Sequence, residues 1–106
     1  MKILNAIRRK IRIGQVEFSQ HAADQSIIRG ISMQDFRDAM ERSEVIEDYP
    51  HDKYGPSCLI LGFTSLQRPL HIHCSYPMRP IIKIITLYEP DTSRWIDFKV
   101  RRQDDA

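Results

Sequence analysis

The sequence contains four histidines, the side chains best suited to transfer protons near neutral pH. His71 and His73 stand two positions apart in an alternating segment, which places both imidazole rings on one face of a strand. His21 begins a short helical pattern, in which Gln25 and Arg29 follow at i+4 and i+8, close to one stripe. A titratable group and a fixed cation therefore point the same way. They form either one wall of a site or a solvated helix face.

These residue types suit cleavage of RNA without a metal. That reaction needs a base for the 2′-hydroxyl, an acid for the 5′-oxygen and positive charge at the phosphorane. His21 and His71 are candidate acids or bases, and Arg29 is a candidate bidentate phosphate ligand. Tyr88 is a candidate proton donor at a strand end, and Lys83 a candidate phosphate contact. Taken alone, each residue also fits an ordinary role in the core or at the surface.

Other chemistries are less favoured by the sequence. His71 and His73 could supply two metal ligands and His21 a third, but no carboxylate stands at a fitting position, so we predict no metal and no cofactor. Cys58 and Cys74 each lie in an apolar run, which is typical of buried thiols in a cytoplasmic protein rather than of a disulfide. Only 4 glycines are present, and they form no phosphate-binding loop.

The composition fits one globular domain spanning residues 1–106, with 42% hydrophobic residues and a net charge of +2. No secretory signal and no membrane-spanning run is expected. Residues 2–12 predict a basic amphipathic helix, which either faces RNA or packs with a solvated basic side. The candidate RNA-binding residues are Arg8, Arg9, Arg12, Gln25, His73 and Lys83.

Periodicity predicts three helices in the first part of the chain, over residues 2–12, 20–29 and 33–42. Ser19 is a candidate N-cap of the second helix, and Gly30 suits its C′ position. Ser32 and Asp35 resemble a capping box that begins the third. Their expected buried stripes contain Ile3, Leu4, Ile7 and Ile11, then Ala22, Ala23 and Ile27, then Met33, Phe36, Ala39 and Met40.

The second part of the chain has strand patterns separated by loops too short for a crossover. Strands are expected over residues 45–49, 57–64, 70–76 and 81–88, after a short extended piece at 15–18. Because helices and strands are segregated, the sequence predicts an α+β domain in which two or three N-terminal helices pack on a three- to four-stranded antiparallel sheet. A final short element over 91–99, with Trp95, Ile96 and Phe98, is expected to cover the sheet.

Several segments in order, SQHAADQSIIRGIS, VIEDYP, CLILGF, RPLHIHCS and IIKIITLYEPD followed by Trp95, resemble the family called domain of unknown function 4258 over residues 16–96. This family resembles bacterial RelE/BrnT-like ribonuclease toxins, encoded beside an antitoxin of zinc-finger or helix-turn-helix type. The resemblance implies that fold and an endoribonuclease activity of the mRNA interferase kind. His21, Arg29, His71 and Tyr88 fall on the motif positions. In the family a basic residue is common four after the histidine, where this chain has Gln25, which predicts a weakened or inactive copy if that position contacts phosphate.

The leading hypothesis is therefore a toxin-like, metal-independent ribonuclease of a toxin–antitoxin pair, acting in the cytoplasm, with homodimerisation left open. Two alternatives remain: a non-enzymatic protein-interaction module, and a small nucleic-acid-binding protein that uses the basic ends of the chain. The discriminating feature is whether His21, Arg29 and His71 line one groove.

Overall fold

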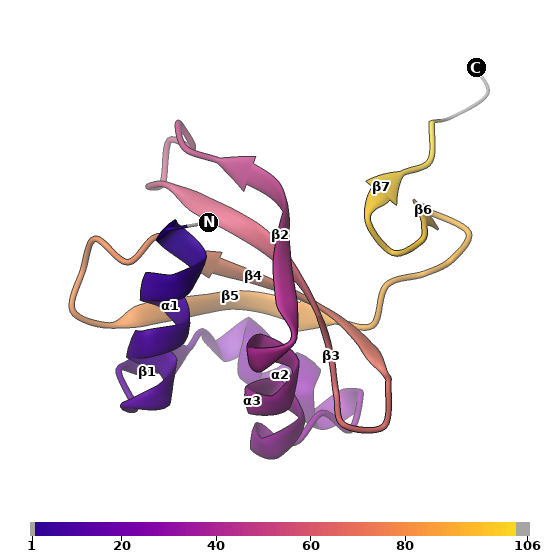
Figure 1. The fold of residues 1–106 in the computed structure, drawn as a ribbon, viewed down its shortest axis with the longest axis horizontal. Coiled ribbons are helices and arrows are strands. Elements are labelled where there is room, and N and C mark those ends of the chain that lie inside the picture. Colours follow the sequence, from indigo (N-terminus) through magenta and orange to yellow (C-terminus); the bar gives the residue numbers. More distant parts are fainter. Residues whose placement is uncertain (1, 104–106) are drawn as a thin grey trace.

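Three helices lie on one face of a five-stranded sheet, and a small hairpin contacts the other face (Figure 1). This is a computed structural model, which describes residues 2–103. The helices are α1 (Lys2–Arg12), α2 (Gln20–Ile28) and α3 (Met33–Glu41). The strands are β1 (Val16–Phe18), β2 (Ser43–Tyr49), β3 (Ser57–Phe63), β4 (Pro69–Ser75), β5 (Ile82–Tyr88), β6 (Trp95–Ile96) and β7 (Val100–Arg101).

The predicted α+β class, with helices segregated from strands, is confirmed, but the sheet is mixed rather than purely antiparallel. Its strand order is β1-β5-β4-β3-β2, in which β2 to β5 pair antiparallel and β1 pairs parallel with β5. The short extended piece found in the sequence is therefore the fifth strand. Its partner lies some sixty residues later, with Val16 opposite Ile82, so no local turn signal could have revealed the pairing.

Capping residues fix the helix ends as predicted. Ser19 Oγ accepts a hydrogen bond from the Ala22 N–H at 3.0 Å. Ser32 and Asp35 form the capping box, with both reciprocal hydrogen bonds at 3.0 Å. Gly30 follows α2 with φ +62°, the left-handed conformation that glycine adopts without a Cβ clash.

The core lies between the helices and the inward face of the sheet. It contains Leu4, Ile7 and Ile11 of α1, Phe36, Ala39 and Met40 of α3, and the strand residues Ile60, Leu70, Ile72, Cys74, Ile82, Ile84 and Leu87. Two predicted core residues are exposed, Ile27 at 79% and Met33 at 47%, and Ile3 and Ala23 are half-buried. Ala22 is the side chain through which α2 enters the core, and Ile27 lies about 140° away from it around the helix. Met33 is the first residue of α3.

A bulge in β5 decides which of its side chains share a face. His73 pairs with Thr86 while Cys74 pairs with Ile84, so Ile85 is an extra residue. Strict alternation would place Lys83 and Tyr88 on opposite faces. With the extra residue, both lie on the face away from the helices, which we call the open face.

The N-cap of α2 holds this bulge. The Ser19 hydroxyl donates to the Ile85 carbonyl at 2.7 Å, and the Ser19 N–H donates to the Ile84 carbonyl at 2.9 Å. One serine therefore connects the start of α2 to the irregular point of β5.

Cys58 and Cys74 are directly opposite each other on β3 and β4, and both are buried, free thiols, as predicted. Among residues 2–103, no helix is long and apolar enough to cross a lipid bilayer.

Candidate functional site in a cationic groove

His71 is fully buried on the open face, beneath the β6–β7 hairpin. Its Nε2–H donates to the Phe98 carbonyl at 2.6 Å. A carbonyl can only accept, so in the neutral imidazole this bond leaves Nδ1 unprotonated. Nδ1 lies 3.2 Å from the hydroxyl of Tyr88 and accepts a hydrogen bond from it. The Trp95 ring packs edge-on against the imidazole, with centroids 4.5 Å apart.

The surroundings favour the uncharged forms of both groups. Burial lowers the pKa of His71, and the Phe98 carbonyl and the Glu47 carboxylate oppose that effect only in part. Burial likewise raises the pKa of Tyr88. Near neutral pH the pair is therefore a protonated phenol that donates to a neutral imidazole.

The C-terminal hairpin supplies the carbonyl that orients His71. Asp97 and Phe98 have φ values of 52° and 63°, and Lys99 N–H closes the turn on the Ile96 carbonyl at 2.9 Å. Two consecutive left-handed residues are typical of a type I′ turn, which usually takes asparagine or glycine. Phenylalanine at such a position is strained, and here the turn presents its carbonyl to His71.

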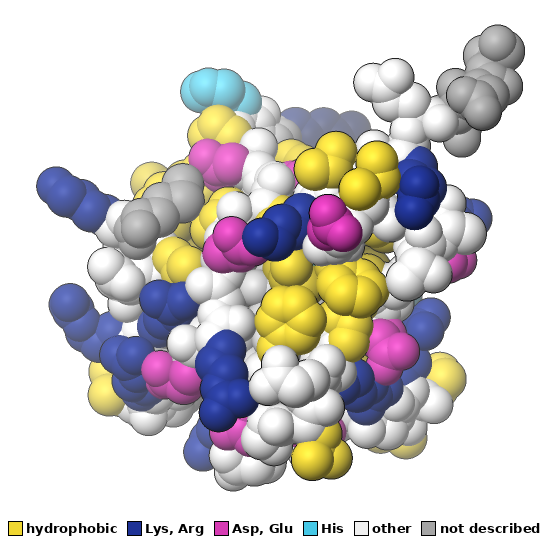
Figure 2. All heavy atoms as spheres, turned by 45° about the vertical axis from the view of Figure 1, so that its right-hand side comes forward, with side chains coloured by type: hydrophobic (Ala, Val, Ile, Leu, Met, Phe, Trp, Pro, Cys, Tyr) yellow, Lys and Arg dark blue, Asp and Glu magenta, His cyan; other side chains and the backbone are white. Residues whose placement is uncertain are grey.

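Arg101 of β7 fastens this hairpin to the sheet. Its guanidinium pairs with the Glu47 carboxylate at 2.9 Å and lies 4.7 Å from the centroid of the Trp95 ring. Phe63 and Phe98 add an edge-on aromatic contact at 6.2 Å. Figure 2 shows hydrophobic side chains gathered on the side of the molecule that carries this hairpin, with basic and acidic side chains interspersed around them.

Tyr88 also lines a groove that carries an excess of positive charge, which we call the cationic groove. Four arginines and two carboxylates contribute to its wall: Arg29, Arg94, Arg101, Arg102, Glu89 and Asp91. An arginine guanidinium presents a planar fork of donors that matches a phosphate. The arrangement can therefore hold a phosphate diester beside the phenol of Tyr88.

Gln25 stands where a basic residue is common in the family, and its side chain holds Arg29 in place. The Arg29 Nε–H donates to Gln25 Oε1 at 2.9 Å, which leaves the terminal nitrogens of the guanidinium for a ligand. A basic residue at position 25 would repel Arg29, whereas the glutamine holds it.

Arg68, which the sequence analysis did not identify, positions the segment after α2. Its terminal nitrogens donate to the Arg29 carbonyl at 2.7 Å and the Gly30 carbonyl at 3.0 Å. Its Nε pairs with the Glu89 carboxylate next to Tyr88. One side chain thus joins the end of α2 to the end of β5. Nothing in the local sequence marks this role, because the partners are more than twenty residues away.

The predicted catalytic residues do not all meet. Arg29 and Tyr88 line the cationic groove, and His71 reaches it through Tyr88. His21 is exposed on α2 and is not among the residues that line this groove. The sequence did not reveal the roles of Glu47, Phe98 and Arg101, although Trp95 and Phe98 do cover the sheet as expected.

The predicted RNA-binding residues of α1 lie in the helical layer. Arg8 donates to the Met40 carbonyl at 2.9 Å and to Ser43, and Arg12 forms a bidentate pair with Glu41 at 2.7 Å. Two of the three arginines therefore connect α1 to α3 and β2. Arg9 is exposed.

His73 and Lys83 line a second groove on the open face, of about 660 Å³. His73 Nε2 lies 2.9 Å from Ser57 Oγ, and its ring packs edge-on against Tyr49 at 5.6 Å. Burial lowers the pKa of His73.

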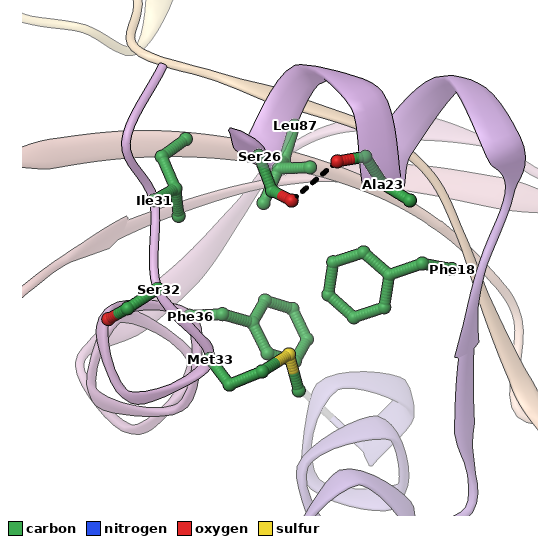
Figure 3. A pocket seen from close by; sticks show the side chains of 8 residues that line it. All are labelled: Phe18, Ala23, Ser26, Ile31, Ser32, Met33, Phe36 and Leu87. Atoms are coloured by element: carbon green, nitrogen blue, oxygen red, sulfur yellow. Dashed lines mark hydrogen bonds between the residues drawn. The ribbon is translucent and has the colours of Figure 1, made fainter. Parts of the chain in front are cut away.

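The helical layer has a small apolar hollow between α2, α3 and β1. Figure 3 shows the rings of Phe18 and Phe36 side by side in it, with Met33 at its edge. Ile27 and Ile28 of α2 are 79% and 74% exposed. This surface is apolar and carries none of the chemistry of the open face.

Fold and site together define a small α+β domain with an arginine-lined groove between the end of α2, the end of β5 and the β6–β7 hairpin. The chain belongs to the family described as domain of unknown function (DUF4258), whose pattern matches residues 18–89. The match runs from β1 through Tyr88 and ends before the β6–β7 hairpin. No curated protein and no solved structure matches the chain.

Proposed function

We propose that this protein is a toxin-like, metal-independent ribonuclease whose active site is the cationic groove. The observation that carries the proposal is the series of hydrogen bonds from Tyr88 through His71 to the Phe98 carbonyl. Tyr88, at the start of this series, lines the cationic groove together with its arginines. An acid–base group with an orienting partner, next to phosphate ligands, is the arrangement that cleavage at a 2′-hydroxyl requires.

The chemistry follows from the direction of these hydrogen bonds. Tyr88 gives its proton to His71 Nδ1 as its oxygen takes the proton of the 2′-hydroxyl, and the 2′-oxygen forms a bond to phosphorus. The Glu47 carboxylate and the Phe98 carbonyl stabilise the resulting imidazolium, against the charge of Arg101, and the terminal nitrogens of Arg29 stabilise the phosphorane. The bond from phosphorus to the 5′-oxygen breaks, and the proton held on His71 returns through Tyr88 and water in the open groove to that oxygen, which restores the neutral pair. The products are a 2′,3′-cyclic phosphate and a free 5′-hydroxyl.

In this proposal the biological setting is a bacterial toxin–antitoxin pair in the cytoplasm, with the antitoxin as protein partner. The family resemblance supports that setting. Gln25 is then a residue that orients Arg29, so its presence does not by itself predict an inactive copy.

The test compares wild type with Tyr88→Phe, which keeps the ring but removes the hydroxyl. Wild type should cleave short single-stranded RNAs in the presence of a chelator, leave cyclic phosphate ends, and arrest growth on expression. Tyr88→Phe should lower the cleavage rate about 100-fold, the lower end of what acid–base catalysis contributes.

His21→Ala is the matched control, because His21 is an exposed histidine outside the groove. It should cleave like wild type. Absence of wild-type cleavage, or equal rates for wild type and Tyr88→Phe, would reject this active site.

A second candidate function is that of a non-enzymatic interaction module, favoured by the apolar hollow and the exposed Ile27 and Ile28. It predicts a stoichiometric complex with a partner protein, which the double variant Ile27→Asp/Ile28→Asp does not form. It also predicts that the free protein does not cleave RNA.

A further inference from the structure

The cationic groove continues across the open face of the sheet. Tyr88 and Arg101 line both the cationic groove and a shallow depression beside it. Asp52 and His73 line that depression and also the groove of about 660 Å³ beyond it. The three hollows adjoin one another in this order and share lining residues, and we call them together the channel, with Tyr88 between its cationic end and its far end.

The far end differs in character from the cationic end. Tyr54 is 87% exposed there, beside Tyr76, His73 and the apolar side chains of Ile81 and Met78. Lys83 and Arg79 add two cations, which Glu17 and Asp52 balance. Aromatic and apolar side chains without excess charge suit nucleobases, which stack on aromatic rings, more than they suit phosphates.

The bulge at Ile85 makes the channel continuous. It brings Lys83 and Tyr88 onto the same face, five residues apart on β5. At about 3.3 Å per residue the two lie roughly 17 Å apart along the strand. That length matches about five stacked nucleotides at 3.4 Å each.

We propose that this channel binds single-stranded RNA of at least about five nucleotides, with phosphates at the arginines and bases on the aromatic far end. The proposal rests on the proposed function for the identity of the ligand as RNA, and it adds a second subsite around Tyr54, His73 and Lys83. That subsite raises the affinity for longer strands above the affinity for dinucleotides, because a dinucleotide held at the arginines does not reach it.

Binding can be measured apart from cleavage with RNA that carries 2′-O-methyl groups, which cannot be cut. Fluorescence anisotropy with a dinucleotide and with an oligonucleotide of about ten nucleotides should show much tighter binding of the longer strand. Tyr54→Ala and Lys83→Ala should each weaken binding of the long strand about tenfold and leave the dinucleotide affinity unchanged. Arg37→Ala is the matched control, since it removes an exposed cation of α3 in the helical layer that is not among the candidate RNA-binding residues.

The proposal that the channel binds RNA would be rejected by equal affinity for long and short RNA, or by an unchanged long-strand affinity in both variants. These results do not depend on catalysis. A protein that binds the long strand through Tyr54 and Lys83 but never cleaves RNA would keep the channel and reject the ribonuclease. A protein that cleaves RNA through Tyr88, and whose affinity for the long strand is unchanged in both Tyr54→Ala and Lys83→Ala, would reject the channel and keep the ribonuclease.

Discussion

At the scale of single residues, His71 illustrates how burial changes what a histidine does. The alternation of its strand correctly indicated that His71 and His73 share a face. In the fold, the Phe98 carbonyl fixes the tautomer of His71 and Tyr88 separates its ring from the groove. Its contribution to chemistry therefore passes through another side chain, and the group to mutate is the hydroxyl of Tyr88, a residue that lines the groove.

Burial of the two histidines predicts a stability that falls as the solution becomes acidic. Both have a pKa below the ordinary 6.5 in the folded protein, so below pH 6.5 the unfolded chain binds protons that the folded chain does not. The free energy of unfolding should therefore fall from about pH 6.5 downward, by at most about 1.4 kcal/mol per pH unit for each proton. Urea unfolding at several pH values between 7.5 and 5 measures this slope.

His73→Gln should reduce that slope without abolishing it, because His71 remains. The charged groups next to the two histidines do not account for the slope of the unfolding free energy with pH. Glu47 and Arg101 face His71 and Asp52 faces His73, and the Glu47 pKa lies below its ordinary 4.5, outside the window. A slope identical in wild type and His73→Gln would show that His73 titrates alike in both states.

At the scale of elements, the backbone of α3 approaches β3 closely at Gly62. A Cβ added at Gly62 would lie 2.1 Å from the Ala39 carbonyl oxygen and 2.7 Å from its carbon. Both are backbone atoms, so no side-chain rotation relieves the clash, and α3 would have to move away from the sheet. The glycine is therefore required by packing, since its backbone has no positive φ.

Gly62→Ala should accordingly lower the free energy of unfolding by about 3 kcal/mol, at the upper end for overpacking. Chemical denaturation measures the loss. Adding Ala39→Gly should give no rescue, because the clash involves backbone atoms. Ile60→Val, a neighbouring core change on β3, should cost only about 1 kcal/mol. Recovery of stability in the double variant would contradict this account.

At the scale of the whole molecule, the β6–β7 hairpin is a two-stranded sheet of its own beside the five-stranded sheet (Figure 1). Its two strands have two residues each and pair only with each other, so it depends on Trp95, Phe98 and Arg101 to stay on the sheet. A two-stranded hairpin has little stability of its own. The hairpin also lies outside the residues that match the family pattern, although it covers His71.

We therefore expect the hairpin to detach before the sheet unfolds. Trp95 is the only tryptophan, so its fluorescence reports on the hairpin while circular dichroism reports on the helices and the sheet. In urea the fluorescence midpoint should precede the dichroism midpoint, and Arg101→Gln should lower only the former. Arg9→Gln, the control on the helical layer, should change neither. Coincident midpoints in wild type and Arg101→Gln would mean that the hairpin unfolds with the domain.

The sequence by itself determined the parts of this protein that depend on near neighbours. Caps at Ser19 and Ser32, the glycine after α2, the antiparallel strands and the α+β class follow from patterns a few residues long, because hydrogen bonds and side-chain periodicity act over that range. The family membership follows in the same way, from several such patterns in a fixed order.

The tertiary structure alone decided which residues meet. The parallel strand β1, the bulge at Ile85 and the carbonyl of Phe98 join segments far apart in the chain, and no local preference encodes them. Of the predicted catalytic residues they bring Arg29, His71 and Tyr88 together and leave His21 on the exposed face of α2. The reason is physical: a residue's chemistry depends on its burial and hydrogen-bond partners, and long-range packing sets both.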